Sequence, residues 1–242
     1  MRPFLHLATR DLDVAAHDEY EAILEASGLT RDELIHVRTD AGPLPEIRPE
    51  DYSGVFLGGS PFSVSDAEKD ATQLRVEREL GAIVDHAVAG RLPMLGLCYG
   101  IGVITQHLGG VMDRRFGEES SAVEVTLTDA GREDPIFGQL ADRFWVCTGH
   151  KEACSTLPPG AVNLITREAC PVQAIRVGES CYATQFHAEL TAEQIIARMV
   201  LYRDIGYFPA DQLEVIAAQV RAAGVAEWPR MIVRGFTERF GR

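Results

Sequence analysis

A cysteine flanked by glycines is the residue in this sequence best suited to covalent chemistry. Cys98 lies in Gly96-Leu97-Cys98-Tyr99-Gly100, between an apolar run at 94–97 and a helical pattern over 100–108. A nucleophile on a tight strand-to-helix turn needs small neighbours, because larger side chains would collide with the backbone there. The helix macrodipole would also stabilise a thiolate at this place. The pentapeptide alone is equally compatible with an inert cysteine buried beside turn glycines.

A histidine and a glutamate form a second pair that fits this chemistry. His187 and Glu189 lie in Gln185-Phe186-His187-Ala188-Glu189, directly after an apolar run. Alternate residues of an extended segment face the same side, so the imidazole and the carboxylate can meet. The carboxylate would then orient the imidazole while the other ring nitrogen faces the thiol. A surface histidine beside a solvated glutamate that opens a helix is the alternative for this motif alone.

A pair of glycines follows another apolar strand. Leu57-Gly58-Gly59-Ser60-Pro61 comes at the end of the run 54–57. Consecutive glycines let backbone N–H groups approach a ligand closely, as the stabilisation of a developing oxyanion requires. The same residues are common in simple turns, so this segment indicates an oxyanion loop only together with the other two.

The elements that must position these segments alternate between strand and helix in the first half. Strands are predicted at 4–8, 34–37, 54–57 and 94–97, and helices at about 18–27, 67–89 and 100–108. This alternation predicts an α/β fold with a mostly parallel open sheet, helices on both of its faces, and a ligand site at the carboxyl ends of the strands.

The second half has shorter, β-rich segments. Runs at 123–127, 143–147, 162–166, 172–177 and 181–186 are separated by turn signals such as 129–131 and 158–160, which predicts a smaller layer of hairpins. Thr191 and Gln194 have the spacing of a capping box that opens a helix to about residue 204. Residues 209–242 predict one or two further helices.

Composition limits the class of protein. The 242 residues are 46% apolar and 24% charged, as in ordinary globular domains. A net charge of −13 argues against nucleic acid and anionic membranes as partners. The sequence has no run of about 18 apolar residues and no three-part signal peptide, which predicts a cytoplasmic location. Five cysteines without a CxxC pair argue against a disulfide framework and a zinc ribbon.

Together the three segments resemble the class I glutamine amidotransferases, a family of cysteine hydrolases. Its marks are a GG-x-P oxyanion loop, a G-x-C-x-G elbow and a late F-H-x-E, and the resemblance runs from about residue 4 to residue 198. The loop Gly58-Gly59-Ser60-Pro61, followed by Ser63-Val64-Ser65-Asp66, is most similar to free-standing domains related to the glutaminase part of GMP synthase. The resemblance implies an amidotransferase-like domain at 1–190 and a C-terminal helical extension at 191–242 packed on it.

The resemblance also implies roles for single residues. Cys98 would be the nucleophile, His187 the general base and then acid, and Glu189 its partner. The backbone N–H groups of Gly59 and Tyr99 would form the oxyanion hole. Substrate contacts are implied at Gly58, Ser60, Gly102 and His150. The implied reaction is attack on a γ-glutamyl carboxamide, loss of ammonia or an amine, and hydrolysis of the γ-glutamyl thioester, with no metal or organic cofactor.

Two departures from the family pattern leave the substrate open. Gly102 stands where the family has a glutamine that helps to hold substrate, and Ala188 stands where it has a proline. One hypothesis is a glutaminase that serves a separate synthetase or ammonia-accepting subunit, since the sequence has no P-loop and no second domain that could use ammonia. Another is a free-standing hydrolase of γ-glutamyl peptides or amines. A non-catalytic binding or regulatory protein is disfavoured because all three catalytic positions are present.

Overall fold

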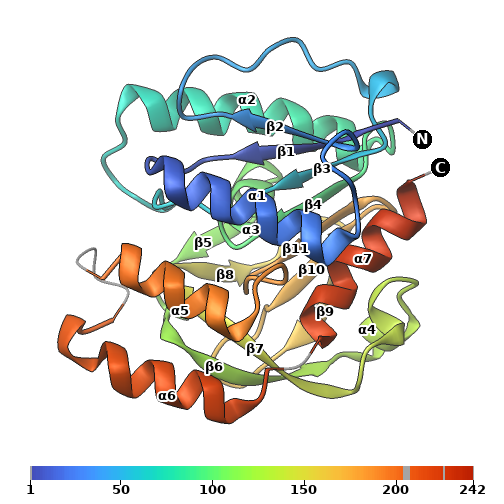
Figure 1. The fold of residues 1–242 in the computed structure, drawn as a ribbon. Helices are drawn as coiled ribbons and strands as arrows, with labels where there is room; N and C mark the ends of the chain where they lie inside the picture. Colours follow the sequence, from blue (N-terminus) through green and yellow to red (C-terminus); the bar gives the residue numbers. More distant parts are fainter. Residues whose placement is uncertain (1, 204–207, 226, 242) are drawn as a thin grey trace.

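A nine-stranded sheet forms the centre of the protein, in a computed structural model that describes residues 2–203, 208–225 and 227–241 (Figure 1). The strand order is β2-β1-β3-β4-β11-β10-β9-β6-β7. Neighbours are parallel from β2 to β11 and antiparallel from β11 to β7. The strands are β1 Phe4–Ala8, β2 Leu34–Arg38, β3 Gly54–Leu57, β4 Met94–Leu97, β6 Glu118–Leu127, β7 Arg143–His150, β9 Ala161–Thr166, β10 Ala174–Val177 and β11 Cys181–Thr184.

The expected α/β architecture is confirmed, and the hairpins continue the parallel sheet as its antiparallel half. A separate two-stranded sheet pairs β5 (Val111–Asp113) with β8 (Ala153–Thr156), two short strands that the sequence did not predict. The helices are α1 Asp13–Ser27, α2 Ala71–Val88, α3 Tyr99–His107, α4 Asp129–Glu133, α5 Ala192–Leu201, α6 Leu213–Ala223 and α7 Trp228–Phe240. Short 3₁₀ turns are η1 Pro49–Asp51, η2 Phe137–Gln139 and η3 Ala210–Gln212.

The helices cover both faces of the sheet, as alternating apolar residues of the strands require. Phe4 of β1 joins α1 and α7 in one core, where Phe236 packs against the rings of Phe4 and Phe56. Leu5, the residue after Phe4 in β1, faces the opposite side of the sheet and joins α2 and α3 in a second core. A third cluster packs α5 and α6 together. The C-terminal helices thus contact the rest of the fold, while the division into two units at residue 190 stays a prediction.

Several predicted boundaries differ from the structure. The helix predicted from residue 18 begins at Asp13. The earlier start was missed because its N-cap residue, Leu12, has no side chain that can cap a helix. The predicted turn at 129–131 was wrong: these residues open α4, capped by Thr128. The capping box of Thr191 is present, and α5 ends at Leu201, whereas residue 204 lies outside the described residues.

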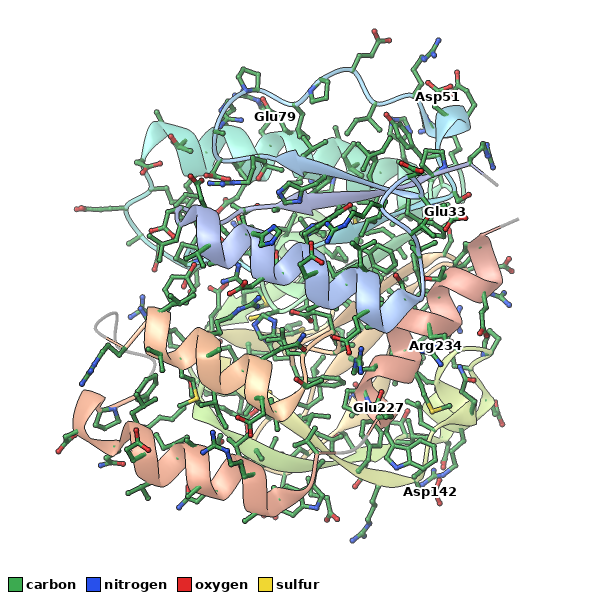
Figure 2. The ribbon with its side chains drawn as sticks, in the orientation of Figure 1. Glu33, Asp51, Glu79, Asp142, Glu227 and Arg234 are labelled. Carbon is green, nitrogen blue, oxygen red and sulfur yellow. The ribbon has the colours of Figure 1, made fainter. Side chains whose placement is uncertain are left out.

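Charged side chains lie mostly at the periphery. Asp142, Glu227 and Arg234, which are labelled in Figure 2, are exposed. None of the helices in the described ranges combines the length and the apolar character needed to cross a bilayer.

Candidate active site

Cys98 lies on a strained turn between β4 and α3. Its backbone has φ +54° and ψ −93°, and it is the one non-glycine residue with a positive φ in the described part of the chain. Residues other than glycine rarely adopt this combination of backbone angles because it is strained, and such strained residues are concentrated at functional sites. The flanking glycines are needed for space, since a Cβ on Gly96 would lie 2.9 Å from the carbonyl carbon of Gly100. A Cβ on Gly100 would lie 3.2 Å from the backbone oxygen of Leu57. The tight turn at Cys98 therefore requires glycine at both flanking positions.

The sheet brings His187 to this elbow. β11 pairs in parallel with β4, and the N–H of Cys98 donates to the backbone oxygen of Thr184 at 2.9 Å. The chain then turns so that Nδ1 of His187 lies 2.8 Å from Oε1 of Glu189. We assign the Nδ1 proton to this bond, which leaves Nε2 for the thiol. Both side chains are buried, and Glu189 completely so.

The electrostatics of the pair favour an imidazolium. Burial opposes the charged form, but the charge of Glu189 and the charge and hydrogen bond of Cys98 outweigh it and raise the pKa of His187 to about 9. Burial likewise opposes ionisation of Glu189, yet His187 and Arg198 hold the pKa of that carboxyl below its usual range. A thiol, an imidazole and a carboxylate thus form one coupled unit of the kind that activates a cysteine nucleophile.

The Gly58–Gly59 loop packs against a buried carboxylate. The N–H of Gly59 donates to Oε1 of Glu19 at 3.0 Å. A Cβ on Gly58 would lie 2.0 Å from Oε2 of Glu19, and a Cβ on Gly59 would lie 2.4 Å from Nη2 of Arg10. The two glycines therefore make room for Glu19 and Arg10, and Gly58 lines neither pocket beside Cys98.

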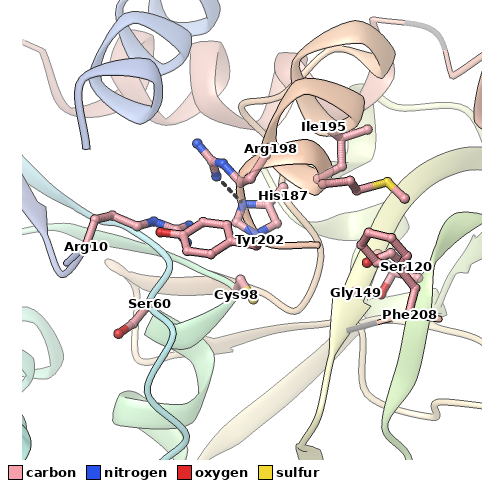
Figure 3. Close-up of a pocket in the computed structure, with 12 residues that line it drawn as sticks. Arg10, Ser60, Cys98, Ser120, Gly149, His187, Ile195, Arg198, Tyr202 and Phe208 are labelled. Carbon is pink, nitrogen blue, oxygen red and sulfur yellow. Dashed lines mark hydrogen bonds between the residues drawn. The ribbon is translucent and has the colours of Figure 1, made fainter. Parts of the chain in front are cut away.

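Two pockets meet at Cys98 and Ser60. The first, here called the Arg10 pocket, lies on the His187 side and is lined in part by Arg10, Ser120, Thr148, Arg198, Met199, Tyr202 and Phe208 (Figure 3). The second, here called the His150 pocket, lies on the other side and is lined in part by Phe62, Ser63, Tyr99, His150, Lys151, Glu152 and Gln185. A scissile bond held over the Cys98 sulfur would have its two ends in different pockets.

Glu152 fills the space beside Gly102. Its carboxylate accepts the backbone N–H groups of Val64 and Ser65, each at 2.8 Å. A Cβ on Gly102 would lie 3.1 Å from Cγ2 of Val64 and 3.2 Å from Oε1 of Glu152. Gly102 itself does not line the His150 pocket. The position at which the resemblance implies a glutamine side chain is therefore taken by a glutamate from the β7–β8 connection.

His150 is held by hydrogen bonds on both ring nitrogens. Nδ1 lies 2.9 Å from the backbone oxygen of Glu152, and Nε2 lies 3.1 Å from Oε2 of Glu118. Ser60 lines both pockets, and its Oγ accepts the N–H of Phe62 at 3.0 Å. Of the predicted substrate contacts, Ser60 and His150 face the site, whereas Gly58 and Gly102 lie behind it.

Several site residues were not singled out in the sequence. They are Arg10, Glu19, Glu152, Gln185 and Arg198. Glu19 interrupts the buried apolar stripe of α1, and Arg198 lies in the buried stripe of α5 beside Ile195 and Met199. A charged residue in an apolar stripe is the signal that would have identified both.

Two groups of side chains have the donor types and spacing of a metal site within the described chain. They are Glu19, His187 and Glu189, and Glu118, His150 and Cys170. Arginines already neutralise the carboxylates of each: Arg198 lies 3.5 Å from Glu19 and from Glu189, and Arg167 pairs with Glu118. These contacts take up the negative charge that would attract a cation.

The sequence matches known proteins over most of its length. The family model described as "Glutamine amidotransferase class-I" matches residues 15–200. The GMP synthase (glutamine-hydrolysing) of Borreliella burgdorferi is 25% identical over 186 residues, which cover 74% of this chain and 34% of that protein. A glutamine-hydrolysing GMP synthase subunit of Thermococcus kodakarensis is 33% identical over 150 residues, 61% of this chain and 72% of that protein.

The sequence of this chain aligns with only about a third of the length of the Borreliella burgdorferi GMP synthase. A solved glutamine amidotransferase from Thermotoga maritima superposes with a TM-score of 0.78 at 20% identity, over 99% of this chain and 98% of that one. This likeness shows a shared fold.

Proposed function

Because the chain belongs to the class I glutamine amidotransferase family, a family of enzymes, we propose that it hydrolyses a γ-glutamyl amide through a thioester on Cys98. The observation that carries this proposal is the strained, positive-φ Cys98 next to the buried His187–Glu189 pair. A nucleophilic cysteine needs access to its substrate and a neighbouring base, and an inert packed cysteine needs neither. Cys98 is partly exposed and lies beside His187.

The proposed reaction has two steps. The Cys98 sulfur attacks the γ-carbonyl carbon, and the imidazolium of His187 gives its proton to the nitrogen, which leaves as ammonia or an amine. Water then attacks the thioester while His187 takes its proton, and glutamate and the free thiol are released. Glu189 keeps the imidazole oriented and stabilises its charged form in both steps.

The oxyanion that forms in each step needs N–H donors. The N–H of Tyr99 lies in the first turn of α3, where helical hydrogen bonds do not use it. The N–H of Gly59 is bound to Glu19, so Gly59 contributes only if it exchanges that carboxylate for the substrate oxygen. We therefore propose Tyr99 as the preorganised donor and Gly59 as the second.

We assign the glutamyl end of the substrate to the His150 pocket. Its carboxylate, Glu152, attracts an ammonium group, and its Tyr99 hydroxyl and Gln185 side-chain oxygen are buried without a hydrogen-bond partner among the described groups. Unpaired buried polar atoms are costly unless a ligand satisfies them. These groups suit the α-amino and α-carboxyl groups of a γ-glutamyl compound.

Glutamine hydrolysis for a separate synthetase-type partner is the first candidate function. The relative from Thermococcus kodakarensis that supports it is itself named as one subunit of its enzyme. Hydrolysis of a γ-glutamyl peptide or amine is the second candidate, favoured by the Arg10 pocket, which offers space beyond Cys98 that ammonia does not need. A binding or regulatory protein without catalysis would have no use for the strained thiol and its base.

Glutamate release by the purified chain separates these candidates. We propose to compare glutamine with γ-glutamylalanine and γ-glutamylethylamide, and expect weak glutaminase activity for the isolated chain because a partner or a larger leaving group must complete the site. Preference for a conjugate supports the free-standing hydrolase, and efficient hydrolysis of glutamine supports a plain glutaminase. A chain that releases glutamate from none of the three, alone or with a synthetase partner, is not this enzyme.

The pH dependence of hydrolysis should have an alkaline limb near pH 9. His187 has its pKa raised to about 9, so the imidazolium that protonates the leaving nitrogen is lost as the pH rises through that value. Glu189→Gln removes a charge that raises this pKa, and the limb should move down towards the ordinary histidine value of about 6.5. The measurement is kcat/KM against pH for both proteins; an unmoved limb would show that Glu189 does not act on His187.

Gly102→Gln tests how the family's missing glutamine is replaced. The new side chain would collide with Val64 and displace the Glu152 carboxylate from its two N–H bonds, each worth about 1.5–3 kcal/mol as a hydrogen bond to a charged group. We expect KM for the best γ-glutamyl substrate to rise at least about tenfold. Gly102→Ala, which adds only the Cβ, is the matched control and should have a much smaller effect. A lower KM for glutamine in Gly102→Gln would show that the side chain fits and that Glu152 is dispensable.

A further inference from the structure

Two buried carboxylates from different elements lie close together behind Cys98 and His187. Glu19 comes from α1 and Glu189 follows β11, and neither side chain is exposed. The ligand atoms of Glu19, His187 and Glu189 lie within 4.8 Å of one another. Two carboxylates at such a distance in a buried site disfavour each other's charge, and one of them takes up a proton unless a cation compensates.

One guanidinium lies between them. Nη1 of Arg198 is 3.5 Å from Oε1 of Glu19 and 3.5 Å from Oε1 of Glu189. The same atom lies 3.4 Å from Nδ1 of His187, the contact dashed in Figure 3. Arg198 is 6% exposed, and its Nη2 and Oε2 of Glu189 are both buried without a hydrogen-bond partner among the described groups. The guanidinium of Arg198 therefore contacts the two carboxylates and is shielded from solvent.

Arg10 does not replace Arg198 in this role. Its Nη2 and Nε contact Oε1 of Glu19 at 2.8 and 3.2 Å, on the side of the Gly58–Gly59 loop. The arginine that contacts Glu189 is Arg198. Two arginines thus balance the two glutamates, and the imidazolium of His187 balances the Cys98 thiolate, so loss of Arg198 leaves this buried cluster one positive charge short.

We propose that Arg198 is a positioning residue for hydrolysis, which keeps Glu19 and Glu189 ionised together so that one holds the oxyanion loop while the other orients His187. The proposal rests on the catalytic roles proposed above for Cys98 and His187. Without Arg198, the two carboxylates share a proton, Glu189 attracts the imidazolium less strongly, and the Cys98 thiolate loses part of its stabilisation.

The neighbouring groups do not remove this requirement. The titratable and charged side chains that interact with Arg198 are Arg10, Glu19 of α1, His187, Glu189 and Tyr202. Those that interact with its partners are His6 of β1 and His36 of β2 beside Glu19, Cys147 of β7 beside Glu189, and Cys98 beside His187. Nε2 of His6 lies 3.2 Å from Oε2 of Glu19, and the Arg10 guanidinium lies over the Tyr202 ring. Both contacts act on the Glu19 side of the cluster, so Glu189 has Arg198 as the cation that stabilises its charge beside His187.

The test is the pH dependence of Cys98 alkylation by iodoacetamide, followed by peptide mass measurement. For Arg198→Met we expect the inflection to move up by about one pH unit or more, which slows alkylation on its acidic side about tenfold. Arg198→Lys, which keeps the charge, should stay close to the parent. Arg221→Met is the matched control, because Arg221 pairs with Glu193 in the first turn of α5 at the surface and should leave the inflection unchanged.

A double variant provides the sharpest check. Glu19→Gln with Arg198→Met removes one carboxylate together with the cation, so Glu189 no longer competes for a proton and the inflection should return towards the parent value. An unmoved inflection in Arg198→Met, or one moved to lower pH, would overturn the proposal, as would a double variant that behaves like Arg198→Met. Thermal unfolding verifies that each variant folds, and Arg198→Gln replaces Arg198→Met if the latter does not.

Alkylation does not depend on the identity of the substrate. If the inflection moves as expected but no γ-glutamyl amide is hydrolysed, the role of Arg198 stands and the assigned reaction is wrong. If hydrolysis occurs but the inflection does not move, the reaction stands and the role of Arg198 is wrong. The kcat/KM profile of Arg198→Met should show the same upward shift of its acid limb, whereas a residue needed only for packing would lower the rate equally at every pH.

Discussion

Cys98→Ala is expected to reduce hydrolysis of the γ-glutamyl substrate by at least about 10⁴-fold, because the sulfur forms the covalent bond in the proposed reaction. The change removes one sulfur atom from a half-exposed elbow, so it leaves little cavity and the fold should persist. The measurement is glutamate release together with thermal unfolding of the same protein sample.

The strained backbone supplies a second readout for this position. Cys98→Gly should be equally inactive but more stable than Cys98→Ala by about 1 kcal/mol or more, since glycine tolerates a φ of +54° and alanine does not. Cys181→Ala, on β11 away from both pockets, is the control and should keep its activity. Hydrolysis by Cys98→Ala near the parent level would show that another group is the nucleophile.

His187→Ala should be nearly as damaging as Cys98→Ala, and the double variant little worse than either. The imidazole activates the thiol and protonates the leaving nitrogen, so neither residue works without the other, and losses within such a unit are strongly non-additive. The three variants are compared by kcat/KM in one assay. Losses that multiply in the double variant would show that Cys98 and His187 act independently.

Local motifs are the part of the site that the sequence made predictable. Cys98 stands between glycines after a strand, and His187 and Glu189 are two residues apart, so their types and spacing already indicate the chemistry that they can perform together. The strand-helix alternation likewise predicted the sheet whose carboxyl edge brings them side by side. The short strands β5 and β8 escaped prediction because, unlike the four-residue strand β3 with its sequence Gly-Val-Phe-Leu, they are not continuous apolar runs: they read Val-Met-Asp and Ala-Cys-Ser-Thr.

The charged residues behind the site could not be placed in this way. Glu19, Arg198 and Glu152 each stand alone in the sequence, and tertiary contacts across 9 to 88 residues bring them to their partners. The sequence shows that Gly102 lacks a side chain, but only the fold shows that Glu152 occupies the space. The pair Gly58–Gly59 was predicted as an oxyanion loop, and the packing of Glu19 and Arg10 against it adds a steric reason for both glycines.

The most direct test of the central claim is the mass of the protein after reaction with a diazo-ketone analogue of glutamine, an electrophile that carries a γ-glutamyl side chain. Cys98 should be labelled, and the four other cysteines, which are buried, should stay unmodified. Excess glutamine or γ-glutamylalanine should slow the labelling by competing for the same pocket. Labelling spread over all five cysteines, or none at Cys98, would contradict the proposal that this thiol attacks a γ-glutamyl carbonyl.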